Sequence, residues 1–589
     1  MGRRILISLL GVFLFACDGV IGGGSGLPRS PDERPAVGAS QGFASQASLH
    51  RLTKEQHRRT VEDLLTRFLG ADASPVLDAI EPVYGIIPDD PADLDVGELV
   101  GSTFSRMSQN VGELHVRGYY DVATTAADAI VQDDFRRTAL FGGCIDEATD
   151  DHSACVGAFI DSFGLWAMRR PLTDDERGFF LDSIYADDGR DYEATPAALR
   201  DLLIAFLASP NFLYSVETEG TEIEDGLYEL DAFELASRLS YHFWNSMPDD
   251  ELFDAAIDGS LLTDAGYAAQ VERVYGDERT RGTFEAFFYE WLSLYRTGDP
   301  FGGVSGGSAQ KTAFIEGYDV SPELRNNMIE EVLAMTEYYR QNGTFTDLFT
   351  SSASFARTED LAAIYEVPPW DGAESLIEFP SPERLGLLGR AALLSAATVY
   401  THPILRGVRI REDFLCDELG LPPAAVDGAP NEVTSRITTR ERIEALTSPG
   451  SCSGCHQFIN GLGFPLEAFD SLGRERNQEM IIDTEGAVSM LPVDVVAMPF
   501  IDDSSDVRTV SGLAELVEEL LGSGKLQSCF ARHYVRFTLG LSADPSNGGD
   551  PETIEALSEE LASNAALADV FKRIAFLPAF KQRLRGDQS

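Results

Sequence analysis

Apolar residues recur at helical spacing along most of the chain. In residues 61–68 they fall on one face of a helix, and Gly70 is a typical residue just past a helix end. Thr53 and Gln56 stand three residues apart before this pattern, as in a capping box. Residues 233–244 repeat the amphipathic pattern, whereas runs of alternating apolar and polar residues are scarce. The chain is therefore expected to be mainly α.

Further helix signals follow the same logic. Pro171 would end one helix, and Thr173 with Glu176 would begin the next as a second capping box. Asp249 or Asp250 would cap the helix that follows residues 233–244. Such repeated starts and stops predict several helical units.

A chain of 589 residues is long enough for several domains. The boundaries follow the gaps between helical patterns and the composition of the segments. We expect a signal peptide at 1–17, a tether at 18–48, an N-terminal helical domain at 49–135, a helical domain with a local disulfide at 136–200, a central helical domain at 201–370, a cytochrome-like domain at 371–480 and a C-terminal helical domain at 500–585.

The N-terminus predicts export. Residues 1–4 are basic, and residues 5–16 are apolar but too few to span a bilayer comfortably. Leu14-Phe15-Ala16-Cys17 resembles a bacterial lipobox, in which Cys17 would become the lipidated first residue. Residues 21–35, rich in Gly, Ser and Pro, then read as a flexible tether.

An ordinary signal peptide with cleavage nearby is the alternative, and both options export the chain. With the lipid, the protein would be a periplasmic or cell-surface lipoprotein held at a membrane by its anchor. No later segment has the length and apolarity of a transmembrane helix.

The charge of the chain excludes one class of partner. A net charge of −50 and a pI near 4.4 give a strongly acidic protein. Nucleic-acid binding needs a basic surface, so we expect no nucleic-acid partner. A solvated acidic surface is the simpler interpretation.

Cys452-Ser453-Gly454-Cys455-His456 has the attachment pattern of c-type haem. One helical turn between the thiols matches the separation of the two vinyl groups, and His456 would be the proximal iron ligand. A zinc site would need a second ligand pair, which the chain lacks. A disulfide between Cys452 and Cys455 remains open. The expected architecture is thus multi-domain and helical, with a cytochrome c-like haem-attachment segment in the C-terminal third.

The other cysteines form an even set. With Cys17 lipidated and two thiols on haem, four remain of seven: Cys144, Cys155, Cys416 and Cys529. In an oxidising compartment an even remainder suggests two disulfides. The first two bracket a short acidic loop and should pair locally. The other two would close a long loop, which contributes on the order of 4 kcal/mol to stability.

The distal side of the iron needs a ligand or an open position. Three methionines downstream of the histidine are candidates: Met480, Met490 and Met498. His402 and His533 could serve only if other segments fold over the haem. Acidic residues are so frequent that no general acid or base is assigned. Phosphate-binding loops, dinucleotide fingerprints and Gly-x-Ser-x-Gly elbows are all missing from the sequence.

Several motifs occur together and in order along the chain. They are residues 52–65, 169–173, 209–214, 239–244 and 247–252 and the block from Cys455 to Arg474. This series resembles the large secreted cytochrome-like proteins of planctomycetes and myxobacteria, which are built from PSD and PSCyt domains of unknown function. The resemblance implies export and haem binding but no substrate. In that family the block after the histidine begins Met-Asp-Pro, where this chain has Ile459-Asn460-Gly461.

The expected function is that of an exported c-type cytochrome-like protein. It would carry out electron transfer, or act as a haem c-dependent oxidoreductase, outside the cytoplasm, with an unidentified redox partner and substrate. The alternative is a non-catalytic surface binding or scaffold lipoprotein in which Cys452 and Cys455 form a disulfide.

Overall fold

The computed structural model describes most of the chain. The described residues are 49–90, 104–149, 151–186, 192–298, 309–318, 320–373, 375–419, 437–448, 452–482, 488–540 and 551–584. Within them helices dominate, and the strands are only two to five residues long. The mainly α expectation is confirmed. Cys17 and the expected tether lie outside the described residues.

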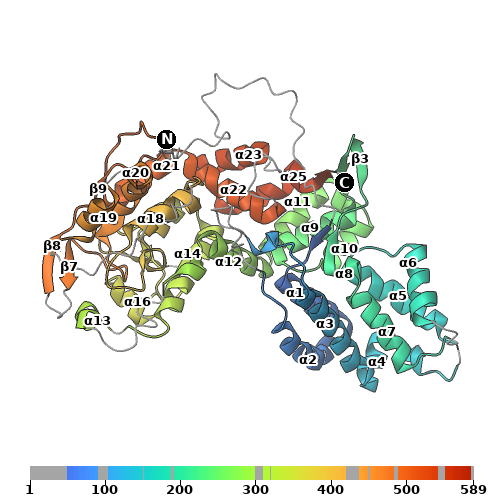
Figure 1. Cartoon of the computed structure of the whole chain (residues 1–589). Helices are drawn as coiled ribbons and strands as arrows, with labels where there is room; N and C mark the ends of the chain where they lie inside the picture. The colour runs from blue at the N-terminus through green and yellow to red at the C-terminus, as the bar shows by residue number, and fades with distance from the viewer. Residues whose placement is uncertain are drawn as a thin grey trace, which may run out of the picture.

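The N-terminal elements form a lobe at the lower right of Figure 1, in blue and teal. Its elements are β1 (Leu49–Arg51), α1 (Lys54–Leu69), α2 (Ser74–Tyr84), α3 (Glu113–Val131), α4 (Asp134–Phe141), α5 (Ser153–Ala167), α6 (Asp174–Gly178), α7 (Pro196–Leu207) and α8 (Pro210–Leu213).

The middle of the chain, in green, begins beside this lobe and extends to the left side of the molecule (Figure 1). It comprises β2 (Tyr214–Val216), β3 (Thr221–Glu224), β4 (Leu227–Glu229), α9 (Ala232–Trp244), α10 (Asp250–Ile257), α11 (Asp264–Gly276), α12 (Arg279–Trp291), α13 (Ala309–Phe314), α14 (Leu324–Asn342), α15 (Asp347–Thr350), β5 (Ala353–Ser354) and α16 (Glu359–Ile364).

The C-terminal part fills the left of Figure 1, and its last helices run back across the top toward the N-terminal lobe. It comprises β6 (Ile377–Glu378), α17 (Ala391–Leu394), α18 (Pro403–Arg409), α19 (Thr439–Thr447), α20 (Cys452–Gly463), β7 (Gln478–Ile482), β8 (Val488–Pro492), β9 (Val496–Ala497), β10 (Val510–Ser511), α21 (Gly512–Gly522), α22 (Lys525–Leu539), α23 (Pro551–Ala562), α24 (Leu567–Arg573), α25 (Pro578–Lys581) and β11 (Gln582–Leu584).

The predicted helix starts are present as hydrogen-bonded caps. Thr53 Oγ1 accepts the backbone N–H of Gln56 at 3.1 Å, and Gln56 Oε1 accepts that of Thr53 at 3.0 Å. Thr173 caps α6 with the same reciprocal pair. Asp249, one of the two aspartates considered, caps α10 by accepting the N–H of Leu252 at 3.1 Å. These local signals fix where the helices begin because each one satisfies a backbone donor at a helix start.

Short antiparallel pairs join distant parts of the chain. Strand β1 pairs with β2, with Arg51 opposite Tyr214. Strand β11 pairs with β4, with Arg583 opposite Tyr228, so the C-terminal strand returns to the middle of the chain. Strands β7 and β8 form a local pair with Met480 opposite Met490.

Two large hydrophobic cores and a small third cluster of Ile443, Phe464 and Ala497 hold the described parts of the molecule together. One contains buried residues between Val61 and Phe253, and the other contains Phe104 and buried residues between Leu230 and Phe580. The ring of Phe253 lies 4.3 Å from that of Trp166 in the first core. Burying a phenylalanine stabilises a fold by about 2 kcal/mol. Phe104 comes from the N-terminal part of the chain but packs in the second core, and Phe253 comes from the middle of the chain but packs in the first. Each core therefore contains a residue from the part of the chain that forms the other.

Both expected disulfides are formed. Cys144 and Cys155 have their α-carbons 5.9 Å apart, and Cys416 and Cys529 have theirs 5.4 Å apart. The second bridge ties α22 to the segment after α18.

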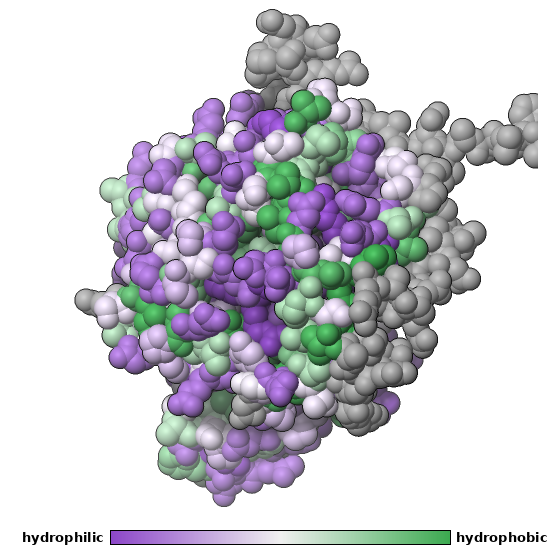
Figure 2. All heavy atoms as spheres, turned by 90° about the vertical axis from the view of Figure 1, so that its left-hand side faces the viewer, coloured by the Kyte–Doolittle hydropathy of each residue, from purple (hydrophilic) through white to green (hydrophobic). Residues whose placement is uncertain are grey.

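Hydrophilic residues cover most of the face that carries β7, β8 and α19, with smaller hydrophobic patches between them (Figure 2). This pattern fits the acidic composition. Among the described residues, none of the helices combines the length and apolarity that a membrane span requires.

Candidate functional site

The Cys-x-x-Cys-His motif forms the first turn of α20. Cys452 is half-buried and Cys455 is exposed, and their thiols are bonded neither to each other nor to another cysteine. The scaffold alternative requires a bond between these two sulfurs, which the structure does not contain. Two free thiols one helical turn apart are the arrangement that thioether attachment to two vinyl groups needs.

Three glycines seat α20 against its neighbours. A β-carbon at Gly463 would lie 1.9 Å from the carbonyl oxygen of Pro403, at the start of α18. One at Gly407, in α18, would lie 2.0 Å from the carbonyl oxygen of Ile459. One at Gly461 would lie 1.9 Å from the carbonyl oxygen of Met498. Because real β-carbons do not approach oxygen so closely, only glycine allows these backbones to touch.

A hydrogen-bond chain orients the His456 imidazole. Its Nδ1 lies 3.4 Å from Oδ1 of Asn460, one turn further along α20. Asn460 Nδ2 donates to Thr447 Oγ1 at 2.9 Å, and Thr447 donates its own proton to the Ile443 carbonyl at 2.8 Å. The amide oxygen of Asn460 is therefore turned toward His456 and can accept only from Nδ1–H. Nε2 is left with its lone pair, as a metal-binding imidazole requires.

A cavity of about 300 Å³ lies beside this imidazole. His456 and the first turns of α20 form one side. Apolar side chains form much of the rest: Phe464, Ala497, Met498 and Phe500. Arg440 also lines the cavity, with its guanidinium carbon 4.6 Å from the centre of the Phe464 ring. Glu444 lines the same cavity and pairs with Arg440 at 2.9 Å, so that cation is balanced. The apolar side chains and a histidine that directly follows two free thiols are compatible with a covalently attached porphyrin.

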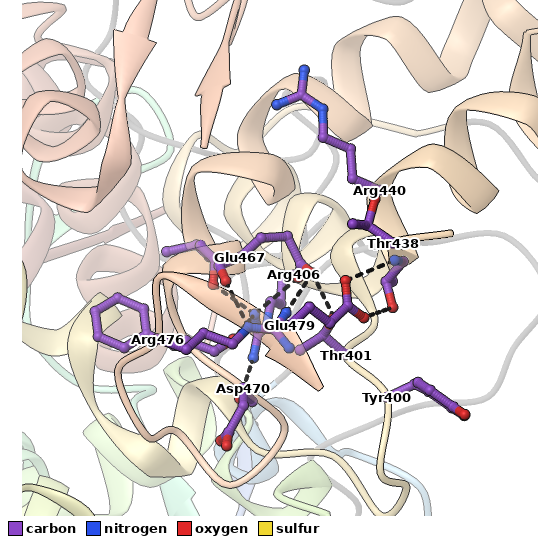
Figure 3. Close-up of polar contacts among 12 residues, drawn as sticks. Tyr400, Thr401, Arg406, Thr438, Arg440, Glu467, Asp470, Arg476 and Glu479 are labelled. Atoms are coloured by element: carbon purple, nitrogen blue, oxygen red, sulfur yellow. Dashed lines mark hydrogen bonds and ion pairs between the residues drawn. The ribbon is translucent and has the colours of Figure 1, made fainter. Parts of the chain in front are cut away.

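A buried ion cluster ties α18 to the segment after α20 (Figure 3). The Glu467 carboxylate accepts hydrogen bonds from Thr401 Oγ1 at 2.7 Å and from Arg476 at 2.9 Å, and its other oxygen lies 3.3 Å from Arg406 Nη1. Burial lowers the pKa of Arg406 to about 10, and Glu467 opposes that shift. The Arg406 guanidinium therefore stays charged at neutral pH. Removing one partner would leave a buried charge without its counter-charge and destabilise the fold.

The Arg406 side chain also forms hydrogen bonds to the backbone of the segment after α20. It donates to the carbonyl oxygens of Leu466 at 2.7 Å and of Asp470 at 2.9 Å, which fixes the turn after α20. Asp470 in turn pairs with Arg474 at 2.6 Å. The Leu466-Glu467 and Phe469-Asp470 part of the family block thus positions α20 and makes no contact with the His456 cavity.

The structure separates the candidate distal ligands. Met498 lines the cavity together with His456. Met480 and Met490 stand opposite each other on β7 and β8 and line no part of it. His402 lies beside Thr398, with 3.3 Å between its Nε2 and the hydroxyl oxygen, and His533 Nε2 lies 3.5 Å from the sulfur of Cys416. Neither histidine borders the cavity.

Sequence reasoning missed Asn460 and Thr447. Asn460 stands four residues after His456 on a helix, so its place on the same helical face was readable from the spacing. Thr447 belongs to α19, and its contact with Asn460 depends on how α19 and α20 pack, which no local pattern reveals.

Comparison with known protein families identifies three consecutive domain matches along the chain, and one of them contains this site. Three family models match: PSD5, a protein of unknown function (DUF1595), over residues 155–217; PSD4, a protein of unknown function (DUF1592), over residues 230–367; and PSCyt3, a protein of unknown function (DUF1588), over residues 384–479. No curated protein and no solved structure matches the chain.

The PSCyt3 match contains α18, α19, α20 and the Glu467 cluster, so it covers the thiols and the imidazole but ends before Met498. The PSD5 match runs from α5 to β2 and the PSD4 match from α9 to α16, with β3 and β4 between them. The order expected from the sequence motifs is confirmed, and the chain belongs to the proteins built from PSD and PSCyt domains of unknown function.

Proposed function

We propose that this protein is an exported c-type cytochrome-like protein that carries one haem on Cys452 and Cys455 and transfers electrons outside the cytoplasm. One observation carries the proposal: two unpaired thiols on the first turn of α20 stand next to a histidine that borders an apolar-walled cavity. When bound, the haem would supply one-electron redox chemistry.

Each residue of the site would have a distinct role in holding the haem. Cys452 and Cys455 would each form a thioether bond, and His456 would offer Nε2 to the iron. Asn460 and Thr447 would hold the imidazole tautomer. Met498 is the distal ligand that the cavity supports best, since it faces the same space from β9 and the segment after it. Phe464 and Phe500 would exclude water from one side.

Exposed apolar side chains on the elements near the cavity fit a surface for a redox partner. Leu446 on α19 is 51% exposed. Leu405 on α18 is also exposed. We infer that these exposed apolar side chains would contribute to the contact with a transient partner.

The test is an absorption spectrum of unfolded protein made with a cytochrome c maturation system. The porphyrin should stay with the chain after denaturation, because thioether bonds survive unfolding and coordination does not. Cys452→Ser or Cys455→Ser should reduce attachment, and the double variant should abolish it. Met490→Ala is the matched control and should keep full attachment. A colourless product, with export and maturation of a reference cytochrome proven in the same cells, would reject the proposal.

Export and anchoring are part of the same proposal. The basis is the Leu14-Phe15-Ala16-Cys17 motif. Cys17→Ala should leave an unprocessed or freely soluble protein, seen as a shift in mass and a loss from the membrane fraction. Unchanged processing and membrane association would reject the lipid anchor while leaving the haem proposal intact.

A further inference from the structure

A second cavity, separate from that of His456, lies where the N-terminal lobe meets α9 and α22. Its volume is about 100 Å³. Arg51 on β1, Arg238 and His242 on α9, Phe537 on α22 and Arg106, which precedes α3, all line it. Segments more than four hundred residues apart in the chain thus share one small polar space.

Two of the three arginines in its wall are neutralised by buried carboxylates. Arg51 forms an ion pair with Asp90. Arg238 Nε donates to one oxygen of Glu217 at 2.8 Å, and its Nη2 contacts the other oxygen. All four side chains are at most 11% exposed. Each pair is close to electrically neutral and leaves no net charge for a ligand.

Arg106 has no such partner. Among the described residues, no carboxylate lies within 4.0 Å of its guanidinium. Nη2 donates to the carbonyl oxygens of Tyr241 at 3.2 Å and His242 at 3.1 Å and to Asn245 Oδ1 at 2.5 Å. Nε and Nη1 have no hydrogen-bond partner among the described residues. Three N–H bonds therefore remain for another molecule.

The charge of Arg106 persists at neutral pH. Burial lowers its pKa to about 10, which still leaves it protonated. Its guanidinium carbon lies 4.1 Å from the centre of the Phe537 ring, which restricts its movement.

The histidines of the wall add no charge. Burial lowers the pKa of His50 and holds that of His242 well below its usual range. His242 Nε2 lies 3.1 Å from the Tyr534 hydroxyl, which donates to the Phe571 carbonyl, so Nε2 must carry the proton. The buried Glu290 carboxylate, which accepts the backbone N–H of Ser105 at 3.2 Å, offsets part of the Arg106 charge from beyond ion-pair distance. Arg106 is therefore the one arginine of this wall whose charge no directly paired carboxylate of the described residues neutralises.

We propose that this cavity binds a small carboxylate anion, with Arg106 as its charged donor. The volume suits a carboxylate of a few carbon atoms and excludes a nucleotide or a sugar. The Arg106 charge has no direct carboxylate partner and is only partly offset by Glu290, which favours an anion of low charge. A carboxylate can accept the unused N–H bonds, and a charged hydrogen bond of this kind is strong in a site partly shielded from water. The net charge of −50 repels anions in general, so this local positive charge is what would admit one.

Sodium acetate is the probe, titrated at constant ionic strength against sodium chloride and followed by calorimetry and by thermal unfolding of the full-length protein. Wild-type protein should show one saturable site and a rising unfolding temperature. Arg106→Gln should weaken acetate binding at least tenfold. Arg117→Gln is the matched control, because Arg117 is 75% exposed and forms a surface ion pair with Asp121. It should bind acetate like the wild type.

Ser215→Leu is a second test of the site that keeps Arg106, in case Arg106→Gln fails to fold. Ser215 lines the cavity and makes none of the Arg106 hydrogen bonds, so a larger side chain there should reduce acetate binding while the guanidinium keeps its contacts. The proposal is overturned if acetate shows no saturable effect on the wild type, or if Arg106→Gln binds it equally well. Tighter binding of inorganic phosphate than of acetate, lost in Arg106→Gln, would overturn the assignment to a carboxylate. None of these outcomes depends on haem attachment.

Discussion

The backbone carbonyl of Met498 lies directly over the α-carbon of Gly461, close enough that a β-carbon there would be 1.9 Å from the oxygen. Gly461 stands five residues after His456 on α20. The contact therefore sets the position of Met498 relative to the imidazole. It also explains how a methionine from a different segment borders the same cavity as His456.

Gly461→Ala should destabilise the C-terminal part of the molecule. The added methyl group has to displace either α20 or the chain at Met498, and overpacking of this kind costs about 3 kcal/mol. Urea denaturation of the variant measures the loss. Gly454→Ala, on the same helix, is the matched control because its β-carbon would meet nothing within 4 Å. Equal stability of the two variants would show that the Met498 segment is not held by this contact.

Met498→Ala should alter the haem environment of the matured protein. Loss of a methionine ligand changes the visible spectrum and lowers the reduction potential, since methionine raises the potential of c-type haem. Met480→Ala and Met490→Ala should leave both properties unchanged, because those side chains lie on β7 and β8 away from the cavity. A shift caused by either of these controls, with none from Met498→Ala, would assign the distal position elsewhere.

Local sequence patterns predicted the parts of the fold that depend on neighbouring residues. The reciprocal hydrogen bonds of Thr53 and Gln56 and the end of α1 before Gly70 both follow from residues within one or two helical turns. The pairing of Cys416 with Cys529 followed from counting cysteines in an exported chain. These predictions needed no knowledge of how helices pack.

The remaining features depend on contacts between distant segments. The pairing of β11 with β4 and the position of Met498 over Gly461 have no local signal. The same holds for Arg106, which looks like any surface arginine in the sequence. It is the packing of η3 (Ser105–Met107) against α22 that places its guanidinium over the Phe537 ring.

Glu467→Gln should destabilise the protein strongly. The carboxylate is 1% exposed and faces the guanidinium groups of Arg406 and Arg476. An amide leaves two buried cations without a counter-charge, which costs about 3 to 5 kcal/mol. Urea denaturation would show the effect as a lower midpoint. Glu518→Gln, the same change at an exposed position of α21, should have little effect. If both variants unfold at the same midpoint, the cluster of Figure 3 does not hold α18 to the segment after α20.

His57 makes the N-terminal lobe sensitive to acid. Its side chain is 1% exposed, and its Nδ1 lies 2.8 Å from the Tyr84 hydroxyl oxygen. Nε2 has no hydrogen-bond partner among the described residues. Burial, with a smaller effect from Arg169, lowers the pKa of His57 from 6.5 to about 3. The folded protein therefore keeps this imidazole neutral at a pH where the unfolded chain protonates it.

The sign of the pH effect follows from proton uptake. Below pH 6.5 the unfolded state binds a proton at His57, whereas the folded state does not bind it until about pH 3. The free energy of unfolding therefore falls as the pH falls through this window. Between pH 7 and pH 5 the loss from this group is about 2 kcal/mol. His57→Gln should remove that part of the slope of unfolding free energy against pH. His115→Gln, at a more exposed histidine, should remove much less. Equal slopes for wild type and His57→Gln would mean that the imidazole is protonated, or solvated, inside the folded lobe.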